Sequence, residues 1–197
     1  MAVKRLFDIA LALIALIMSL PVFLLIAIAV KLNSSGGVFY KQIRVGKHGN
    51  EFKLFKFRTM YINSDNAGLL TIGNKDYRIT RVGYWLRKYK LDELPQLLNV
   101  LKGDMSLVGP RPEVRKYVNM YTPAQLRVLT VKPGVTDWAS IKYFDENELL
   151  AGSDNPEDMY IKSIVPSKIN KNLEYIDNHN LLMDVKIILF TLKRIFQ

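Results

Sequence analysis

The sequence contains no cysteine and only two histidines, which excludes several kinds of active site. Without cysteine there can be no disulfide, no thiolate nucleophile and no cysteine-bound metal. The two histidines, His48 and His179, stand far apart in the chain. A zinc site built on histidine, or a serine–histidine triad, is therefore not expected, and chemistry that needs neither group is favoured.

Negative charge is also scarce. The 197 residues include 28 Lys and Arg against 18 Asp and Glu, a formal net charge of +10. This balance predicts a polyanionic partner, which could be nucleic acid, anionic lipid or a phosphorylated substrate. The sequence has no recognisable nucleic-acid motif, and its aromatic residues are not spaced as a base-stacking platform. Nucleic acid is therefore not the expected partner.

Charged residues are absent from the segment 9–30, IALALIALIMSLPVFLLIAIAV. As a straight helix these 22 residues would extend roughly 33 Å, about the thickness of a bilayer's hydrocarbon core. A cleaved signal peptide and a buried helix of a soluble domain are the alternatives, but the run is long for a signal peptide. We predict a membrane-anchoring helix over residues 1–31 and a separate globular domain over residues 32–197.

Pro21 lies near the middle of this apolar segment, where it removes one helix hydrogen bond and predicts a kink. The hydroxyl group of Ser19 is placed to satisfy part of the freed backbone. Lys4 and Arg5 precede the segment and Lys31 follows it. Basic flanks favour the cytoplasmic side of a membrane. Both flanks can lie on that side if the helix bends and returns. Two topologies stay open, a kinked spanning helix and a re-entrant helix.

The rest of the chain predicts an α+β fold that is mainly helical. Two runs with partial alternation, 38–46 and 51–60, predict a small β-hairpin closed by the turn KHGN. Residues 61–80 are polar and rich in turn formers, so we expect a mobile loop there.

Helical patterns follow the loop. One covers 81–90, and a short helix covers 94–103, where Pro95 suits the first turn and Gly103 the C-terminal cap. Further helical stretches are predicted within 113–136, with a turn at KPGVT.

The C-terminal part contains an acidic segment and an amphipathic helix. Residues 145–158 are acidic and loop-like, with room for a short helix. The helix predicted over 181–196 has an apolar stripe made of Leu181, Leu182, Val185, Ile188, Leu189, Leu192 and Phe196. This stripe fits either a helix packed on the core or an interfacial helix that lies on a membrane.

Asp92 and Glu93 stand side by side before a predicted helix. Most neighbouring acid pairs are solvated helix starts. Here, free N–H groups and positive helix-end charge gather around the pair, and Arg87, Lys88 and Lys90 come just before it. An ionised carboxylate can attack phosphorus when cations neutralise the approaching phosphate. Mg²⁺ suits a site with one or two carboxylates together with substrate phosphates.

Arg111 stands between Pro110 and Pro112 in the segment GPRP. The prolines fix the backbone on both sides, and a rigid arginine loses less entropy when it grips a phosphate with two nitrogens. Taken alone, the segment is more typical of a proline-rich turn whose arginine faces water.

These features occur together in a longer pattern. The segment 91–112, LDELPQLLNVLKGDMSLVGPRP, strongly resembles the signature of the bacterial sugar transferase family, the monotopic phosphoglycosyl transferases. The resemblance extends along nearly the whole chain, through KRLFD, YKQIRVGKHG, FKLFKFRTM, RITRVGYWLRK, VKPGVT, EYIDN and LLMDVKIILFTLK. The length resembles that of the small members, which have only the catalytic domain.

The resemblance implies an enzyme that moves a sugar-1-phosphate from a UDP-sugar to polyprenol (undecaprenyl) phosphate and releases UMP. It implies Asp92 as a nucleophile that forms a phosphosugar–aspartyl intermediate. Asp92 and Glu93 would bind Mg²⁺. Glu93 would assist the reaction either through this Mg²⁺ ion or as a base toward the lipid phosphate. Arg111 would hold phosphate, with support from Arg87 and Lys56.

The resemblance also implies a cellular setting. The family's apolar helix breaks at a Ser-Pro step and re-enters the cytoplasmic leaflet of the bacterial inner membrane, with the catalytic domain on the cytoplasmic face. The product would begin a glycan such as capsule, O-antigen, exopolysaccharide or a protein glycan.

Two positions depart from the family pattern. The residue before Pro21 is Leu20, with Ser19 one place earlier, so the backbone is repaired differently at the kink. After VKPGVT many members continue with glycine and later a Gly-Arg pair, whereas this chain reads DWASIKYFDENELL. The identity of the sugar is therefore not predicted.

Two other functions stay open at this point. A non-catalytic, membrane-tethered basic module could bind anionic lipid or nucleic acid, with strong salt dependence and no need for Asp92 or Glu93. A metal-dependent phosphohydrolase acting on isoprenoid phosphates could use the same two acids, but it would release free phosphate rather than a nucleotide.

Overall fold

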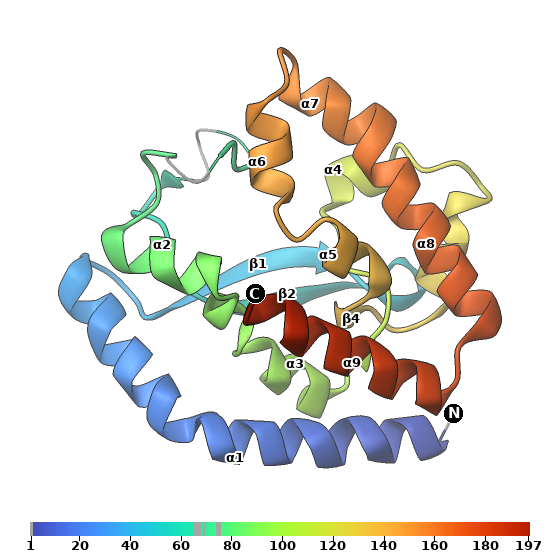
Figure 1. Ribbon diagram of the computed structural model, residues 1–197, viewed down its shortest axis with the longest axis horizontal. Coiled ribbons are helices and arrows are strands. Elements are labelled where there is room, and N and C mark those ends of the chain that lie inside the picture. Colours follow the sequence, from blue (N-terminus) through green and yellow to red (C-terminus); the bar gives the residue numbers. More distant parts are fainter. Residues whose placement is uncertain (1, 65–67, 69, 74–75) are drawn as a thin grey trace.

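The computed structural model describes residues 2–64, 68, 70–73 and 76–197. Helices account for 59% of the described residues, and the described strands form two small two-stranded sheets (Figure 1). The mainly helical α+β fold predicted from the sequence is confirmed. The loop predicted over 61–80 lies partly outside the described residues.

The longest element is α1 (Ala2–Asn33), a helix that continues through Pro21. It runs along the bottom of the molecule in Figure 1 and then bends upward. The Ser19 hydroxyl donates to the carbonyl oxygen of Leu16 at 3.2 Å, and not to that of Ile17, which is the carbonyl that Pro21 leaves without its helix donor. The bend follows from Pro21, because proline removes a hydrogen bond and crowds the preceding turn. The helix is long and apolar enough to cross a membrane, and most of its apolar side chains are exposed.

Charged side chains attach the start of α1 to the globular domain. The Lys4 ammonium group donates to the carboxylate of Asp184 at 2.6 Å, and Asp184 is fully buried. The Asp8 carboxylate accepts from the Ser106 hydroxyl at 2.8 Å and from the backbone N–H of Leu107 at 3.2 Å. Each of these acids is therefore buried with a hydrogen-bonding partner that compensates its lost hydration.

The other end of α1 is attached to the same domain. The buried Arg58 guanidinium donates to the carbonyl oxygen of Ser34 at 2.8 Å and to that of Ser35. The side-chain oxygen of Asn33 accepts from the backbone N–H of Val82 at 3.1 Å. Both ends of the apolar helix thus contact one globular body.

The predicted hairpin is present. Strand β1 (Phe39–Val45) pairs with β2 (Glu51–Phe57) in antiparallel register along its whole length. A short 3-10 turn, η1 (Lys47–Gly49), lies between them, as the KHGN segment predicted.

The two predicted helices around the acid pair are also present. They are α2 (Arg81–Lys88) and α3 (Gln96–Lys102), and the 3-10 turn η3 (Leu91–Glu93) lies between them. Pro95 is the N-cap residue of α3, and Gly103 is its C-cap residue with a φ of 96°. This left-handed conformation is the one that glycine adopts without steric cost.

The prediction of a turn at KPGVT is wrong over its last three residues. They form strand β4 (Gly134–Thr136), which pairs in parallel with β3 (Ser106–Val108). A Cβ atom on Gly134 would lie 2.1 Å from the backbone nitrogen of Gly109, so this close approach requires glycine. Strands this short show no alternation, which is why the sequence pattern did not indicate them.

Further helices surround the two sheets. The described elements are α4 (Arg115–Val118), the 3-10 helix η4 (Gln125–Thr130), α5 (Trp138–Lys142), α6 (Glu146–Ala151), α7 (Pro156–Met159), the π-helical turn η5 (Tyr160–Ile164) and α8 (Val165–Asn178). The acidic segment 145–158, predicted to be a loop with room for one short helix, carries two short helices, α6 and α7.

The last helix, α9 (Leu181–Ile195), has a narrow buried side. Asp184 and Ile187 point into the core, whereas Leu182 is 83% exposed and Phe196, just after the helix, is 84% exposed. Most of the apolar stripe predicted for this helix therefore lies on the outside of the molecule. Of the two roles left open by the sequence, the interfacial helix is the one favoured.

We expect Lys4→Met to lower the free energy of unfolding by about 2 kcal/mol, because Asp184 would keep a buried charge without its cation. Denaturation by urea in detergent measures the change. Lys116→Met is the matched control, since the Lys116–Glu157 pair is exposed and worth less than about 1 kcal/mol. Equal stability of the two variants would contradict the anchoring role of Lys4.

Candidate active site

The acid pair lies on the η3 turn just ahead of α3. Lys90, which precedes the turn, has a left-handed backbone with φ of 54°. The chain reverses there and turns Asp92 and Glu93 into the protein, where Asp92 is buried. The position at a helix start agrees with the sequence prediction, but the pair is not a solvated one, since Asp92 is buried and Glu93 is half-buried.

Glu93 is held by two cations. Its carboxylate accepts from Lys56 Nζ at 2.9 Å, and the Arg111 guanidinium donates to both of its oxygens, with Nη1 3.1 Å from Oε2. Burial opposes the ionisation of Glu93, but Arg111 and then Lys56 outweigh it and hold the pKa of this carboxyl well below its usual range. Glu93 is therefore a fully paired anion.

Asp92 has a different environment. Its Oδ2 atom is 4.0 Å from Lys56 Nζ, and its Oδ1 atom is buried with no hydrogen-bond partner in the described part of the chain. Burial raises the pKa of Asp92, Lys56 acts in the opposite direction, and the neighbouring Glu93 charge raises it further. The two adjacent acids are thus driven apart in pKa, which is the pattern of groups with different chemical tasks.

Arg111 is fixed by its backbone as well as by its side chain. Its N–H group donates to Asp137 Oδ2 at 2.9 Å, and the other oxygen of Asp137 accepts from the backbone N–H of Ser140. Asp137 is buried and is the N-cap residue of α5. The sequence analysis noted DWAS only as a departure from the family pattern, although Asp is one of the residues preferred at a helix N-cap.

Two further cations line the same cleft. Arg87, on the last turn of α2, is half-buried, and burial lowers its pKa while Asp92 acts against this effect. Lys90 Nζ donates to the Phe144 carbonyl oxygen at 3.2 Å and lies 4.6 Å from the centre of the Phe144 ring. Burial also lowers the pKa of Lys90. Lys90 was not among the residues to which the sequence assigned a role.

The structure brings together five of the residues singled out from the sequence. Asp92, Glu93, Lys56, Arg87 and Arg111 all line a cleft of about 1380 Å³. The residues of the helix break, Ser19 and Pro21, lie in the bend of α1 and are not part of its wall.

The donor set of the cleft fits a metal ion that is shared with a substrate. The described residues contain no cluster of three or more His, Cys, Asp or Glu side chains that could hold a metal unaided. Mg²⁺ typically binds one or two carboxylates and completes its shell with water and substrate phosphates. The unpartnered Oδ1 atom of Asp92, beside Glu93, meets that requirement.

The comparison with known families decides the classification. The family described as "Bacterial sugar transferase" matches residues 1–197. The chain belongs to this family. It is thereby related to the enzymes that its sequence motifs resemble.

Individual members of the family are similar over almost the whole chain. An uncharacterized sugar transferase of Bacillus subtilis (strain 168), EpsL, is 39% identical over 195 residues, which are 99% of this chain and 88% of the relative. A UDP-N-acetylgalactosamine-undecaprenyl-phosphate N-acetylgalactosaminephosphotransferase of Aeromonas hydrophila is 39% identical over 98% of this chain. A UDP-glucose:undecaprenyl-phosphate glucose-1-phosphate transferase of Xanthomonas campestris pv. campestris is 40% identical over 98% of it.

The chain covers different shares of these relatives. It spans 88% of the Bacillus protein, but 43% of the Aeromonas enzyme and 38% of the Xanthomonas enzyme. Each of the three matches covers at least 98% of this chain.

Lys56→Met should raise the pKa of Asp92 further, because Lys56 is the main cation that favours its ionised form. Infrared difference spectra across a pH titration, with Asp92→Asn as the reference, measure this carboxyl group directly. Lys41→Met, on the same hairpin but outside the cleft wall, should leave the titration unchanged. A wild-type pKa at or below the ordinary value of 3.8 would contradict the assigned environment.

Proposed function

We propose that this protein transfers a sugar-1-phosphate from a UDP-sugar to undecaprenyl phosphate and releases UMP. The observation that carries the proposal is that the two neighbouring acids have different environments. Glu93 is paired with cations, whereas Asp92 is buried and has an oxygen without a hydrogen-bond partner. The names of the Aeromonas and Xanthomonas relatives support the substrate classes, because each names a UDP-sugar and undecaprenyl phosphate.

The first step forms a covalent intermediate on Asp92. An oxygen of its carboxylate attacks the phosphorus atom that bears the sugar. The bond from this phosphorus to the oxygen bridging the two phosphates breaks, and its electron pair leaves with UMP. Arg111 and Lys56 lie where they can neutralise the phosphate as it approaches, and preorganised cations of this kind stabilise developing negative charge.

The second step returns the enzyme to its starting state. A phosphate oxygen of undecaprenyl phosphate attacks the same phosphorus, the acyl-phosphate bond breaks, and the Asp92 carboxylate is regenerated. The product is a lipid-linked diphosphosugar. An acyl phosphate keeps much of the transfer potential of the diphosphate it came from, so the second transfer need not run uphill.

Mg²⁺ is part of the proposal. Asp92 and Glu93 would hold it together with the substrate phosphates, and it would neutralise phosphate charge when bound. Glu93 contributes a permanent negative charge for this purpose, since Arg111 and Lys56 keep it ionised.

We also infer that α1 enters and leaves the same leaflet of the bacterial inner membrane, with the rest of the chain on the cytoplasmic face. The supporting observation is that Asp8 at one end of α1 and Asn33 at the other both bond the same globular domain. A helix that spans the bilayer would place these two ends on opposite sides. The bend at Pro21 supplies the change of direction.

UMP release tests the reaction. Purified protein in detergent receives Mg²⁺, undecaprenyl phosphate and, in turn, UDP-glucose and UDP-N-acetylgalactosamine. We expect lipid-dependent UMP from at least one donor, and a loss on the order of 1,000-fold in Asp92→Asn because the nucleophile is removed. Asp154→Asn, an exposed acid outside the cleft wall, is the matched control. Full activity in Asp92→Asn, or free phosphate as the product, would contradict the proposal.

Asp137→Asn should lower kcat about tenfold, because one of the two N–H groups that Asp137 accepts from would lose its acceptor and Arg111 would be held less firmly. The asparagine still has one oxygen with which to cap α5, so folding should be retained. Asn155→Ala, which removes the exposed N-cap of α7, is the control and should leave kcat unchanged. If kcat stays at the wild-type value in Asp137→Asn, Asp137 has no role in positioning Arg111.

A further inference from the structure

The cleft extends beyond the acid pair into an apolar groove between α1 and α9. On α1 its wall is formed by Leu11, Ile14, Ala15 and Met18. These positions follow the i, i+3, i+4, i+7 spacing, so they form one stripe along one side of the helix. The stripe belongs to the half of α1 that precedes the bend.

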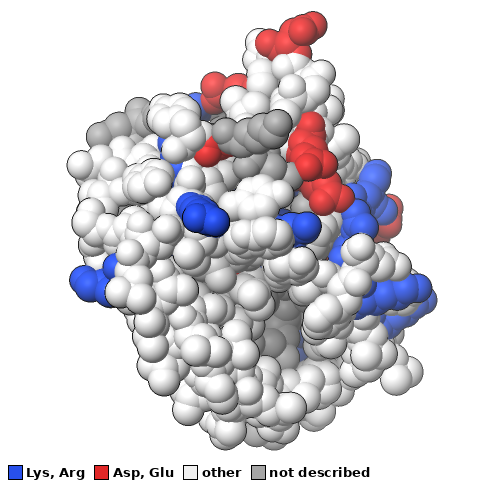
Figure 2. All heavy atoms as spheres, turned by 60° about the vertical axis from the view of Figure 1, so that its left-hand side comes forward, with Lys and Arg blue, Asp and Glu red and all other residues white. Residues whose placement is uncertain are grey.

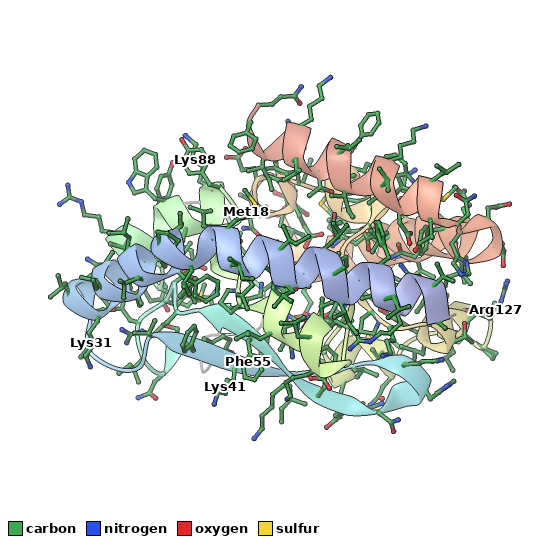
Figure 3. The ribbon with its side chains drawn as sticks, turned by 90° about the horizontal axis from the view of Figure 1, so that it is seen from below. Met18, Lys31, Lys41, Phe55, Lys88 and Arg127 are labelled. Carbon is green, nitrogen blue, oxygen red and sulfur yellow. The ribbon has the colours of Figure 1, made fainter. Side chains whose placement is uncertain are left out.

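The facing wall of the groove comes from α9. Ile188, Leu192 and Phe196 line it, spaced four residues apart along one side of the helix and its C-cap. Figures 1 and 3 show α1 and α9 running side by side. They are tied together near their first turns by the bond between Lys4 and Asp184.

The two stripes are not packed against each other. Ile14 is 52% exposed and Met18 77% exposed, and Leu192 across the groove is 48% exposed. In Figure 3 the Met18 side chain points from α1 into the space between α2 and α9. Apolar residues that stay exposed along a concave surface mark a place where an apolar ligand binds.

The floor of the groove leads directly to the charged site. Leu94 and Leu97 line it, and they lie one and four residues after Glu93 on the same turn and helix. In Figure 2 the lower part of the molecular surface carries few charged side chains and is hollowed, whereas acidic and basic side chains lie above it. The cleft is therefore cationic at one end and apolar at the other.

We propose that this groove binds the isoprenoid tail of the lipid phosphate, with the phosphate at Lys56 and Arg111. The assignment rests on the proposed function and names the place of its lipid acceptor. Only one of the two substrates has both a phosphate and a long apolar chain, and only that substrate matches both ends of the cleft. Because α1 is the helix assigned to the membrane, the tail reaches the groove from the bilayer without crossing water.

Binding of the lipid without any sugar donor tests the groove by itself. Native mass spectrometry of the detergent-solubilised protein gives dissociation constants for undecaprenyl phosphate and for geranyl phosphate, which has the same head and a short tail. Ala15→Trp fills the groove from α1, and Leu192→Trp fills it from α9. Ile17→Trp is the matched control, since Ile17 is 63% exposed on the same helix but does not line the cleft.

We expect each groove variant to weaken undecaprenyl phosphate binding about tenfold, as displacement of a few methylene contacts would do. Geranyl phosphate should bind the wild type and the three variants equally. Ile17→Trp should bind undecaprenyl phosphate as tightly as the wild type does. Undecaprenyl phosphate binding that is unchanged in both groove variants would overturn the proposal, and so would equal weakening in Ile17→Trp. UMP release in the wild type is measured separately, so failure of the groove and failure of the proposed reaction give different results.

Discussion

The ion pairs of Glu93 with Arg111 and Lys56 are the interactions on which the rest of the site depends. Burial by itself drives both neighbouring carboxyl groups toward their neutral forms. Since both cations bond Glu93, this acid stays ionised, and Asp92 is left with a raised pKa and an oxygen without a partner. A carboxylate that attacks phosphorus needs an oxygen without a strong partner, and both oxygens of Glu93 are paired with cations. The structure therefore separates the acid that holds charge from the acid that is free to react.

The attachment of α1 places this site beside an apolar surface. Asp8 fixes the start of the helix to β3, which leads into the segment that carries Arg111, and Arg58 fixes the other end next to β2, which carries Lys56. The anchors of the apolar helix thus lie on, or directly after, the two strands that carry or lead to the cations of the site. A shift of α1 would strain both strands, so the position of the site relative to the apolar surface is set by short, buried contacts.

The predictable features were those encoded within a few residues of one another. Pro95 and Gly103 bound α3 because each has a conformational preference of its own, and the hairpin follows from a turn between two alternating runs. The parallel pairing of β3 with β4 was missed because it joins segments far apart in the chain and each strand has only three residues. The role of Asp137 depends on that pairing, which brings it to the backbone of Arg111. Long-range contacts of this kind leave no local sequence signal.

Under the proposed reaction, the same arrangement accounts for the order in which two anionic substrates are used. A UDP-sugar and a lipid phosphate would repel each other if both met the cations around Asp92 at once. A covalent intermediate avoids this conflict, because UMP carries one phosphate away before the lipid phosphate has to approach. The groove also contributes, since a tail bound between α1 and α9 keeps the lipid acceptor close. Its phosphate stays outside the site as long as the sugar donor occupies the cations. The apolar walls supply affinity that does not compete with the sugar donor for the cations, so the lipid can stay bound through both steps.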